Sequence, residues 1–121
     1  MFLKNQWYAA AVSRELQEKP LARRICGEPV ALFRTRSGKI GAVEDRCPHR
    51  SAPLSAGSCG AESIRCGYHG IEFGTDGACT LIPHQPNIPP RMRVRAYPAA
   101  ERWGYAWIWM GDPAAADPAR I

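Results

Sequence analysis

Residues 47–70 read CPHRSAPLSAGSCGAESIRCGYHG and hold two pairs of metal-binding side chains. Cys47 and His49 form a Cys-x-His pair, and after sixteen intervening residues Cys66 and His69 form a Cys-x-x-His pair. Each pair combines one thiol with one imidazole, so the stretch supplies two ligands of each kind. Soft thiolates and imidazoles at such tight spacing indicate metal binding.

This ligand set favours a binuclear iron–sulfur cluster. A [2Fe–2S] cluster takes two protein ligands on each iron, and in the Rieske arrangement two His bind one iron and two Cys bind the other. A structural zinc site also uses two Cys and two His, but its usual spacing pairs Cys with Cys and His with His. The sequence therefore predicts a [2Fe–2S] cluster with a zinc-stabilised binding module as the alternative, and the predicted ligands are Cys47, His49, Cys66 and His69.

The flanks of this stretch are patterned as short strands. Apolar and β-branched runs separated by Gly, Pro and Asp are typical of an all-β sandwich or small barrel. We expect strands at residues 7–12, 21–25, 29–33, 40–44, 71–73, 79–82, 93–99 and 103–110. Residues 13–17 are expected to form one helical turn capped by Ser13. Glu101 and Arg102 are expected to form the turn of a final hairpin, and residues 45–70 an irregular loop.

Composition and charge describe an ordinary folded domain. The 121 residues suffice for one core, and 45% of them are hydrophobic. The net charge of +5 is spread without a run of like charges, which does not favour a nucleic-acid partner. No segment has the roughly 18 apolar residues of a membrane span, and the N-terminus lacks the apolar core of a signal peptide. Because five cysteines is also an odd count, we expect no disulfide framework and a cytoplasmic protein.

The chain resembles the N-terminal Rieske domain of the oxygenase component of Rieske non-haem iron oxygenases. Residues 47–50 (CPHR), 52–55 (APLS) and 66–70 (CGYHG) match the ligand loops of that family. Residues 5–8 (NQWY) and 107–112 (WIWMGD) are similar to its monooxygenase branch, which includes the vanillate and dicamba O-demethylase oxygenases. The resemblance extends over almost the whole chain.

The resemblance implies a Rieske-type antiparallel β-sandwich with a small cluster-binding subdomain of two ligand loops. It implies a Rieske domain over residues 1–110, with its loops at about 45–70, and a linker over residues 111–121 toward a catalytic domain. In that family the catalytic domain holds a mononuclear iron through two His and a carboxylate. After the cluster histidines this chain has only His84, so we expect the catalytic domain to be absent from it and assign no catalytic residue.

One-electron transfer is the function that the resemblance implies. The cluster would accept an electron from a reductase or ferredoxin and pass it to the mononuclear iron of a neighbouring subunit in a homotrimer. An aromatic-ring oxygenase or O-demethylase would use the domain in this way, and a stand-alone Rieske ferredoxin is the alternative. High-potential Rieske proteins carry an extra cysteine in each loop, joined as a disulfide. Ala52 and Tyr68 stand at those positions here.

Other candidate residues have plainer interpretations. Three cysteines outside the pairs are expected to be small buried side chains: Cys26, Cys59 and Cys79. The alternating aromatic residues are expected to pack in the core or at an interface: Trp103, Tyr105, Trp107 and Trp109. Three arginines are expected on one strand face, as a solvated edge or as a partner-docking patch: Arg91, Arg93 and Arg95. His84 is expected to be a loop histidine.

Overall fold

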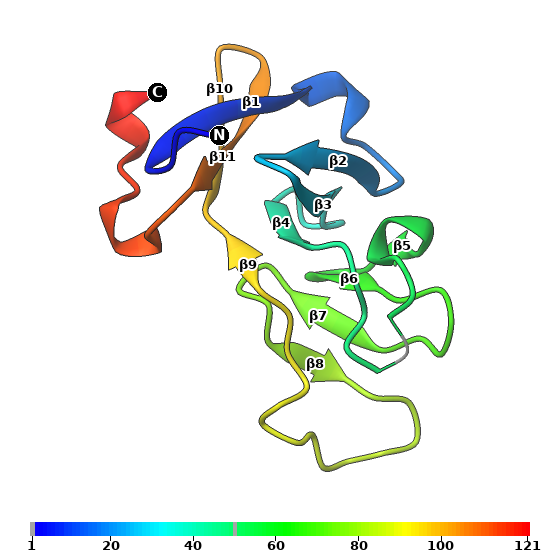
Figure 1. The fold of residues 1–121 in the computed structure, drawn as a ribbon. Coiled ribbons are helices and arrows are strands. Elements are labelled where there is room, and N and C mark those ends of the chain that lie inside the picture. Colours follow the sequence, from blue (N-terminus) through cyan, green and yellow to red (C-terminus); the bar gives the residue numbers. More distant parts are fainter. Residues whose placement is uncertain (1, 50) are drawn as a thin grey trace.

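The chain folds into three antiparallel sheets (Figure 1). The computed structural model describes residues 2–49 and 51–121. The first sheet has the strand order β1 (Gln6–Val12), β11 (Tyr105–Met110) and β10 (Ala99–Arg102). The second has the order β2 (Leu21–Ile25), β3 (Glu28–Arg34), β4 (Ile40–Glu44) and β9 (Ala96–Tyr97). The third has the order β5 (Ser58–Cys59), β6 (Ser63–Arg65), β7 (Glu72–Gly74) and β8 (Cys79–Leu81).

This architecture confirms the predicted all-β, antiparallel class, and most strands lie within a residue or two of the predicted ranges. The strand predicted at residues 93–99 is wrong in extent. Only Ala96–Tyr97 pair with β4, and the next strand belongs to another sheet. Pro98 separates the two because it has no N–H to continue a ladder. A chain that changes sheets at this point joins the first sheet to the second.

The turn of the final hairpin lies two residues beyond the predicted position. Arg102 pairs with Tyr105, so Trp103 and Gly104 form the turn, with φ values of 60° and 79°. A two-residue turn with positive φ at both central residues matches the right-handed twist of the strands, and Gly accepts that conformation easily. The turn exposes the Trp103 side chain, which is 69% accessible, so Trp103 does not pack in the core, and packing at an interface stays a prediction.

Four short 3-10 turns complete the regular structure of the described residues, and two of them correct the sequence-based predictions. In η1 (Ser13–Glu15) the Val12 N–H donates to Glu15 Oε1 at 2.9 Å, so Ser13 does not act as the cap. The stretch predicted to be irregular contains η2 (Leu54–Ala56) as well as β5 and β6. No helix in residues 2–49 and 51–121 has the length and apolar character needed to cross a membrane.

Two hydrophobic cores lie on either side of the second sheet. The first core fills the space between the first and second sheets, where Leu32, Ile108 and Met110 are fully buried. The second core joins the other face of the second sheet to the third sheet and the ligand loops. Cys47 and Cys66 belong to this second core. The sulfur ends of the two predicted ligand pairs are therefore fixed by packing.

The tail after β11 lies against the first sheet (Figure 1). It contains η3 (Pro113–Ala115) and η4 (Pro118–Arg120). The Trp109 Nε1–H donates to the Asp112 carbonyl at 2.7 Å, and the Trp7 Nε1–H donates to the Asp117 carbonyl at 3.0 Å. Trp109 is buried, as predicted for an alternating aromatic residue. The division of the chain into a domain over residues 1–110 and a linker over 111–121 stays a prediction.

An ion pair joins an inner strand of the second sheet, β3, to the edge strand of the first sheet, β10. Arg34 on β3 donates from both terminal nitrogens to the carboxylate of Glu101 on β10, at 2.9 and 2.6 Å. Its Nε also donates to the Leu16 carbonyl at 2.6 Å. The Arg34 guanidinium holds the pKa of the Glu101 carboxyl below its ordinary value. The folded state therefore binds a proton at Glu101 more weakly than the unfolded chain does.

We predict that Glu101→Gln lowers the free energy of unfolding by about 1 kcal/mol at pH 7, the upper value for an ion pair screened by solvent. The Glu101 side chain is 35% exposed, which is why the surface value applies. A depressed carboxyl pKa contributes stability above the unfolded value of about 4.3 and loses it as pH falls through the folded value. Urea unfolding of both proteins between pH 7 and pH 3 should therefore show their difference shrinking in acid. Glu18→Gln, at an exposed position without an ion pair among the described residues, is the control.

Candidate metal centre

The first ligand loop follows β4 and is closed by two sets of hydrogen bonds. The Asp45 carboxylate accepts from the Ser55 N–H at 2.7 Å and from the Ser55 hydroxyl at 2.6 Å. Inside this clamp, the Cys47 N–H donates to the Ala52 carbonyl at 2.8 Å, and the Ser51 N–H donates to the Cys47 carbonyl at 2.7 Å. These bonds fix the backbone from which the first Cys and His project.

The second ligand loop repeats the inner pattern. The Cys66 N–H donates to the Ile71 carbonyl at 2.8 Å, and the Gly70 N–H donates to the Cys66 carbonyl at 3.0 Å. In both loops the residue four places after the cysteine has a positive φ, 60° at Ser51 and 77° at Gly70. Two separate stretches thus form the same hydrogen-bonded turn after their cysteines.

The two loops contact each other backbone to backbone at a pair of glycines. A Cβ placed on Gly57 would lie 1.9 Å from the Arg65 carbonyl oxygen and 3.1 Å from the Gly67 nitrogen. A Cβ on Gly67 would lie 3.3 Å from the Ala56 carbonyl oxygen. Only a residue without a side chain fits at Gly57, because the neighbouring backbone occupies the space that a Cβ would need. This close approach sets the separation of the two loops.

The four predicted ligands divide into a buried pair and an exposed pair. Cys47 and Cys66 are 1% and 2% accessible and lie in the second core. His49 and His69 are exposed, and their Nδ1 atoms lie 3.2 Å apart. The Tyr68 ring lies 4.0 Å from the His69 ring, centroid to centroid. The loops therefore present sulfur toward the interior and imidazole toward the surface.

This arrangement fits the ligand division of a Rieske cluster. Two imidazole nitrogens 3.2 Å apart can bind one metal ion at about 2.1 Å each, with an angle of about 100° at the metal. The cysteines, held in a different layer of the site, are available to a second ion. Within residues 2–49 and 51–121, no three His, Cys, Asp or Glu side chains surround a single ion position. Two irons with two protein ligands each need no such group.

A cavity of about 440 Å³ lies beside the exposed histidines. His49, His69 and Ile71 form one part of its wall, and residues 82–92, which follow β8, form the rest. Ile82 and Met92 give this wall an apolar surface, and Arg91 adds one positive charge. The imidazole pair is therefore reached through a partly apolar recess on the surface.

The remaining cysteines and the third histidine lie outside this centre. Cys26, Cys59 and Cys79 are half-buried rather than fully buried, which corrects the sequence-based interpretation. Burial raises the pKa of the Cys59 and Cys79 thiols, so both stay protonated near neutral pH. His84 is exposed in a turn, with φ of 62°, as predicted for a loop histidine.

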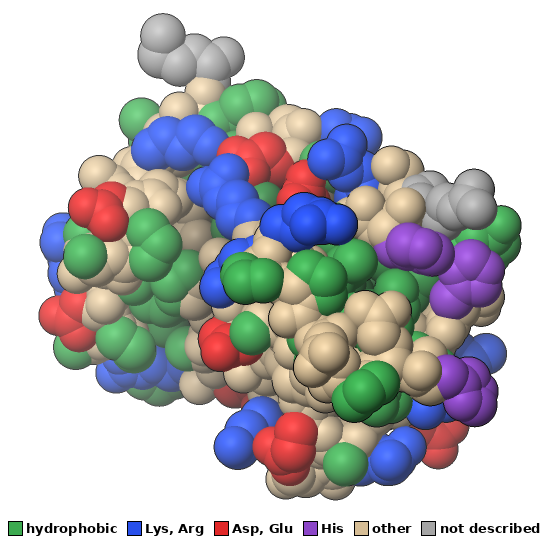
Figure 2. Space-filling model, turned by 90° about the horizontal axis from the view of Figure 1, so that it is seen from below, with side chains coloured by type: hydrophobic (Ala, Val, Ile, Leu, Met, Phe, Trp, Pro, Cys, Tyr) green, Lys and Arg blue, Asp and Glu red, His purple; other side chains and the backbone are tan. Residues whose placement is uncertain are grey.

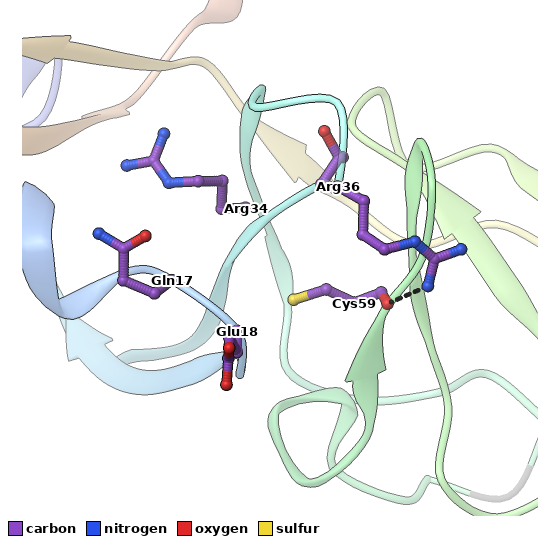
Figure 3. A pocket seen from close by; sticks show the side chains of 6 residues that line it. Gln17, Glu18, Arg34, Arg36 and Cys59 are labelled. Atoms are coloured by element: carbon purple, nitrogen blue, oxygen red, sulfur yellow. Dashed lines mark hydrogen bonds between the residues drawn. The ribbon is translucent and has the colours of Figure 1, made fainter.

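Cys59 borders a second cavity, of about 450 Å³, that contains none of the predicted ligands (Figure 3). Gln17 and Glu18 form one side of it, and Arg34 and Arg36 form the other. Arg36 donates to the Cys59 carbonyl at 3.4 Å, which ties the cavity wall to β5. The cavity lies where the segment after η1 meets the ends of β3 and β5.

Sequence reasoning missed the residues that position the predicted ligands. Asp45, Ser55 and Gly57 received no role from the sequence, although all three lie in the ligand stretch. The available signal was an acidic residue two places before the first Cys and a serine at the end of the first loop. Arg91, Arg93 and Arg95 do not share a strand face, because β9 begins only at Ala96.

Comparisons with known proteins agree with this geometry. The model of the Rieske [2Fe–2S] domain family matches residues 6–98. The toluene-4-sulfonate monooxygenase system iron–sulfur subunit of Comamonas testosteroni is 47% identical over 119 residues, which cover 98% of this chain and 34% of that protein. The dicamba O-demethylase oxygenase component of Stenotrophomonas maltophilia is 47% identical over 121 residues, which cover 99% of this chain and 36% of that protein.

Solved structures give the same result. The crystal structure of apo dicamba monooxygenase matches with a TM-score of 0.93 at 47% identity, over 99% of this chain and 38% of that chain. The chain thus spans about a third of the length of the relatives that it matches. The predicted resemblance and the predicted [2Fe–2S] cofactor are both confirmed, which leaves no reason to retain the zinc module. This chain belongs to the Rieske [2Fe–2S] domain family.

Proposed function

We propose that this chain transfers single electrons through a [2Fe–2S] cluster, with Cys47 and Cys66 on one iron and His49 and His69 on the other. The observation that carries the proposal is the division of the ligands: both cysteines are buried, and both histidines are exposed with their Nδ1 atoms 3.2 Å apart. When bound, the cluster supplies a one-electron carrier.

The protein's contribution is to shield one side of the site and open the other. The second core keeps water from the cysteine side chains, and a low-dielectric surrounding strengthens electrostatic interactions there. The exposed imidazoles give a partner protein the shortest approach to the site. The chain is thereby suited to pass electrons between proteins rather than to bind a small substrate at the cluster.

We propose that the donor is a reductase or ferredoxin and that the acceptor is the mononuclear iron of a catalytic domain in a neighbouring subunit of a homotrimer. The exposed histidine pair supports an acceptor outside this domain. The relatives described above are oxygenase components and subunits, which supports this role over that of a stand-alone ferredoxin. Residues 111–121 would then lead toward the catalytic domain. Free thiols at Cys26, Cys59 and Cys79 favour the reducing cytoplasm.

The substrate is proposed to be chosen outside this domain. Two relatives with the same 47% identity to this chain are named for different substrates, toluene-4-sulfonate and dicamba. Similarity within the Rieske domain therefore does not follow the substrate. The common element is oxidation of an aromatic compound, for which we propose an aromatic-ring oxygenase or O-demethylase.

The first test is the composition and reduction potential of the purified protein. We expect two irons and two acid-labile sulfides per chain, a Rieske-type EPR signal on reduction, and a potential of about −150 mV. Imidazole ligation lowers the negative charge of the cluster and raises the potential above the roughly −400 mV of four-thiolate ferredoxins. Ala52 and Tyr68 cannot form the extra disulfide of high-potential Rieske proteins, which places the value at the low end.

Protein-film voltammetry and metal analysis check these values. Zinc without sulfide would contradict the cluster, and a potential above about +200 mV, near the upper end of the Rieske range, would contradict the argument from the loops.

A further inference from the structure

We propose that the outer face of the first sheet is the surface on which the catalytic domain of the same polypeptide packs in a longer oxygenase. The inference rests on the place in an oxygenase proposed above, and it adds where the second domain sits. We call this surface the aromatic face. Its members are exposed or half-buried side chains of β1, β10, β11 and the turn between β10 and β11: Ala9, Val12, Ala100, Trp103, Tyr105 and Trp107.

The strand register brings these side chains to one side of the sheet. Val12 pairs with Tyr105, and Ala9 pairs with Trp107. Residues that lie directly opposite each other on antiparallel strands point to the same face. Ala106, which lies between the two aromatic residues on β11, is buried in the first core. The aromatic face is therefore the side of the first sheet that points away from this core.

The tail after β11 ends on the aromatic face. Arg120 and Ile121 border a cavity of about 120 Å³ whose wall also includes Trp107. The Arg102 guanidinium donates to the Pro118 carbonyl at 3.2 Å and so holds the end of the tail against the edge strand of the sheet. A polypeptide that continues from the tail therefore starts beside this face.

The part of the aromatic face beyond the tail is open to solvent. Trp109, whose ring nitrogen donates to the tail, is 3% accessible, whereas Tyr105 is 44% and Trp103 is 69% accessible. The Tyr105 and Trp107 rings lie 6.3 Å apart, centroid to centroid. Exposed aromatic side chains gathered in one patch are typical of protein–protein contacts. The open patch thus continues a contact surface that the tail already covers in part.

The longer relatives indicate what covers this patch. The chain matches about a third of the length of each relative described above, so in those proteins the larger part of the polypeptide is attached to a domain of this fold. The tail would lead such a continuation onto the aromatic face. This argues for a domain of the same polypeptide, and not for a separate partner protein.

The aromatic face and the histidine pair lie at opposite ends of the domain. In Figure 1 the first sheet is at the top, and the third sheet is toward the bottom. Figure 2, which is seen from below, shows the histidine side chains at the surface. The second sheet and the two cores lie between the two ends. A catalytic domain that packs on the first sheet leaves His49 and His69 free for a neighbouring subunit, as the proposed function requires.

The experiment compares this chain alone with a chimera. In the chimera the chain replaces the matched region of the dicamba O-demethylase oxygenase component, which is 47% identical to it. Hydroxyl-radical labelling and mass spectrometry measure the solvent access of aromatic side chains. Trp103 and Tyr105 should be labelled strongly in the isolated chain. In the chimera their labelling should fall to near that of Trp109, which is 3% accessible.

Tyr105→Lys introduces a charge into the proposed contact. In the chimera this variant should restore the labelling of Trp103 to its level in the isolated chain, because burial of an unpaired charge is costly and opens the contact. Leu3→Lys is the matched control, since it makes the same kind of change at a residue that is 71% accessible. The Leu3 carbonyl accepts from the Cys26 thiol in the turn between β2 and β3, away from the aromatic face. This control should leave Trp103 protected.

Three results would overturn the proposal. They are a chimera that does not fold, a folded chimera in which Trp103 and Tyr105 stay fully labelled, and a dimer of the isolated chain that Tyr105→Lys dissociates. The dimer would assign the face to a second copy of the chain.

The proposed electron-transfer function is tested separately, by the iron and sulfide content of the isolated chain and its reduction by dithionite. An isolated chain without a cluster would contradict that function and leave the labelling result unchanged. A reducible cluster together with an unprotected aromatic face would overturn this inference alone.

Discussion

Replacing Cys66 with serine is expected to leave the protein without its cluster. Cys66 is 2% accessible and belongs to the second core, so water has little access to take its place as the predicted ligand. A hydroxyl is a harder and weaker ligand than a thiolate for iron–sulfide chemistry. Replacing a residue that only orients a ligand lowers metal affinity about 10- to 100-fold. Replacing a predicted ligand itself should therefore lower the affinity for the cluster by more than about a hundredfold.

Iron and sulfide analysis of the purified variant, with its visible spectrum, measures this loss. Cys79→Ser is the matched control, because Cys79 is a half-buried free thiol outside the ligand loops. It should retain the full iron content. A Cys66→Ser protein that still holds two irons and two sulfides would show that another residue binds the cluster.

The second large effect is expected for Gly57→Ala. The added methyl group should push the two ligand loops apart. The new Cβ would lie 1.9 Å from the Arg65 carbonyl oxygen, far inside van der Waals contact, and its neighbours are backbone atoms that cannot rotate away. Overpacking of this kind costs about 3 kcal/mol, the upper end of the usual range. We expect both a lower melting temperature and incomplete cluster assembly, measured by calorimetry and by the iron content per chain.

Gly67→Ala tests the same contact from the other loop. Its Cβ would lie 3.3 Å from the Ala56 carbonyl oxygen, a tight contact that a small shift relieves. This variant should assemble most of its cluster and melt close to the wild type. Equal behaviour of the two variants would mean that the Gly57 contact does not set the separation of the loops.

The fold class could be predicted from local sequence patterns, but the elements that were predicted wrongly are determined by tertiary structure. Strand residues 21–25 and 40–44 alternate or cluster apolar side chains, and the structure has strands at the same residues. The final turn was misplaced because a tryptophan with positive φ is uncommon, whereas Glu101 and Arg102 are ordinary turn residues. The pairing of β10 with β11 overrides that local preference.

The candidate site shows the same limit. The four predicted ligands are close in sequence within each pair, so their spacing alone suggested a metal centre. The clamp between Asp45 and Ser55 spans ten residues, and nothing in the sequence distinguishes this acid from its neighbour Glu44. The sequence contains Gly57 but does not reveal which backbone approaches it. These supporting contacts depend on how the loops fold over the second core.

The first and last strands bring the two ends of the folded body together. The Asn5 N–H donates to the Met110 carbonyl, and the Asn5 side chain accepts from the Asp112 N–H at 2.8 Å. The backbone at Asn5 and the backbone at Met110 therefore lie about one strand spacing apart, roughly 5 Å. A domain with adjoining ends can be inserted into a surface loop of another protein, or circularly permuted, without opening a sheet. Because of the β1–β11 pairing, this domain could be inserted into another protein as an electron-transfer unit without disruption of its sheets.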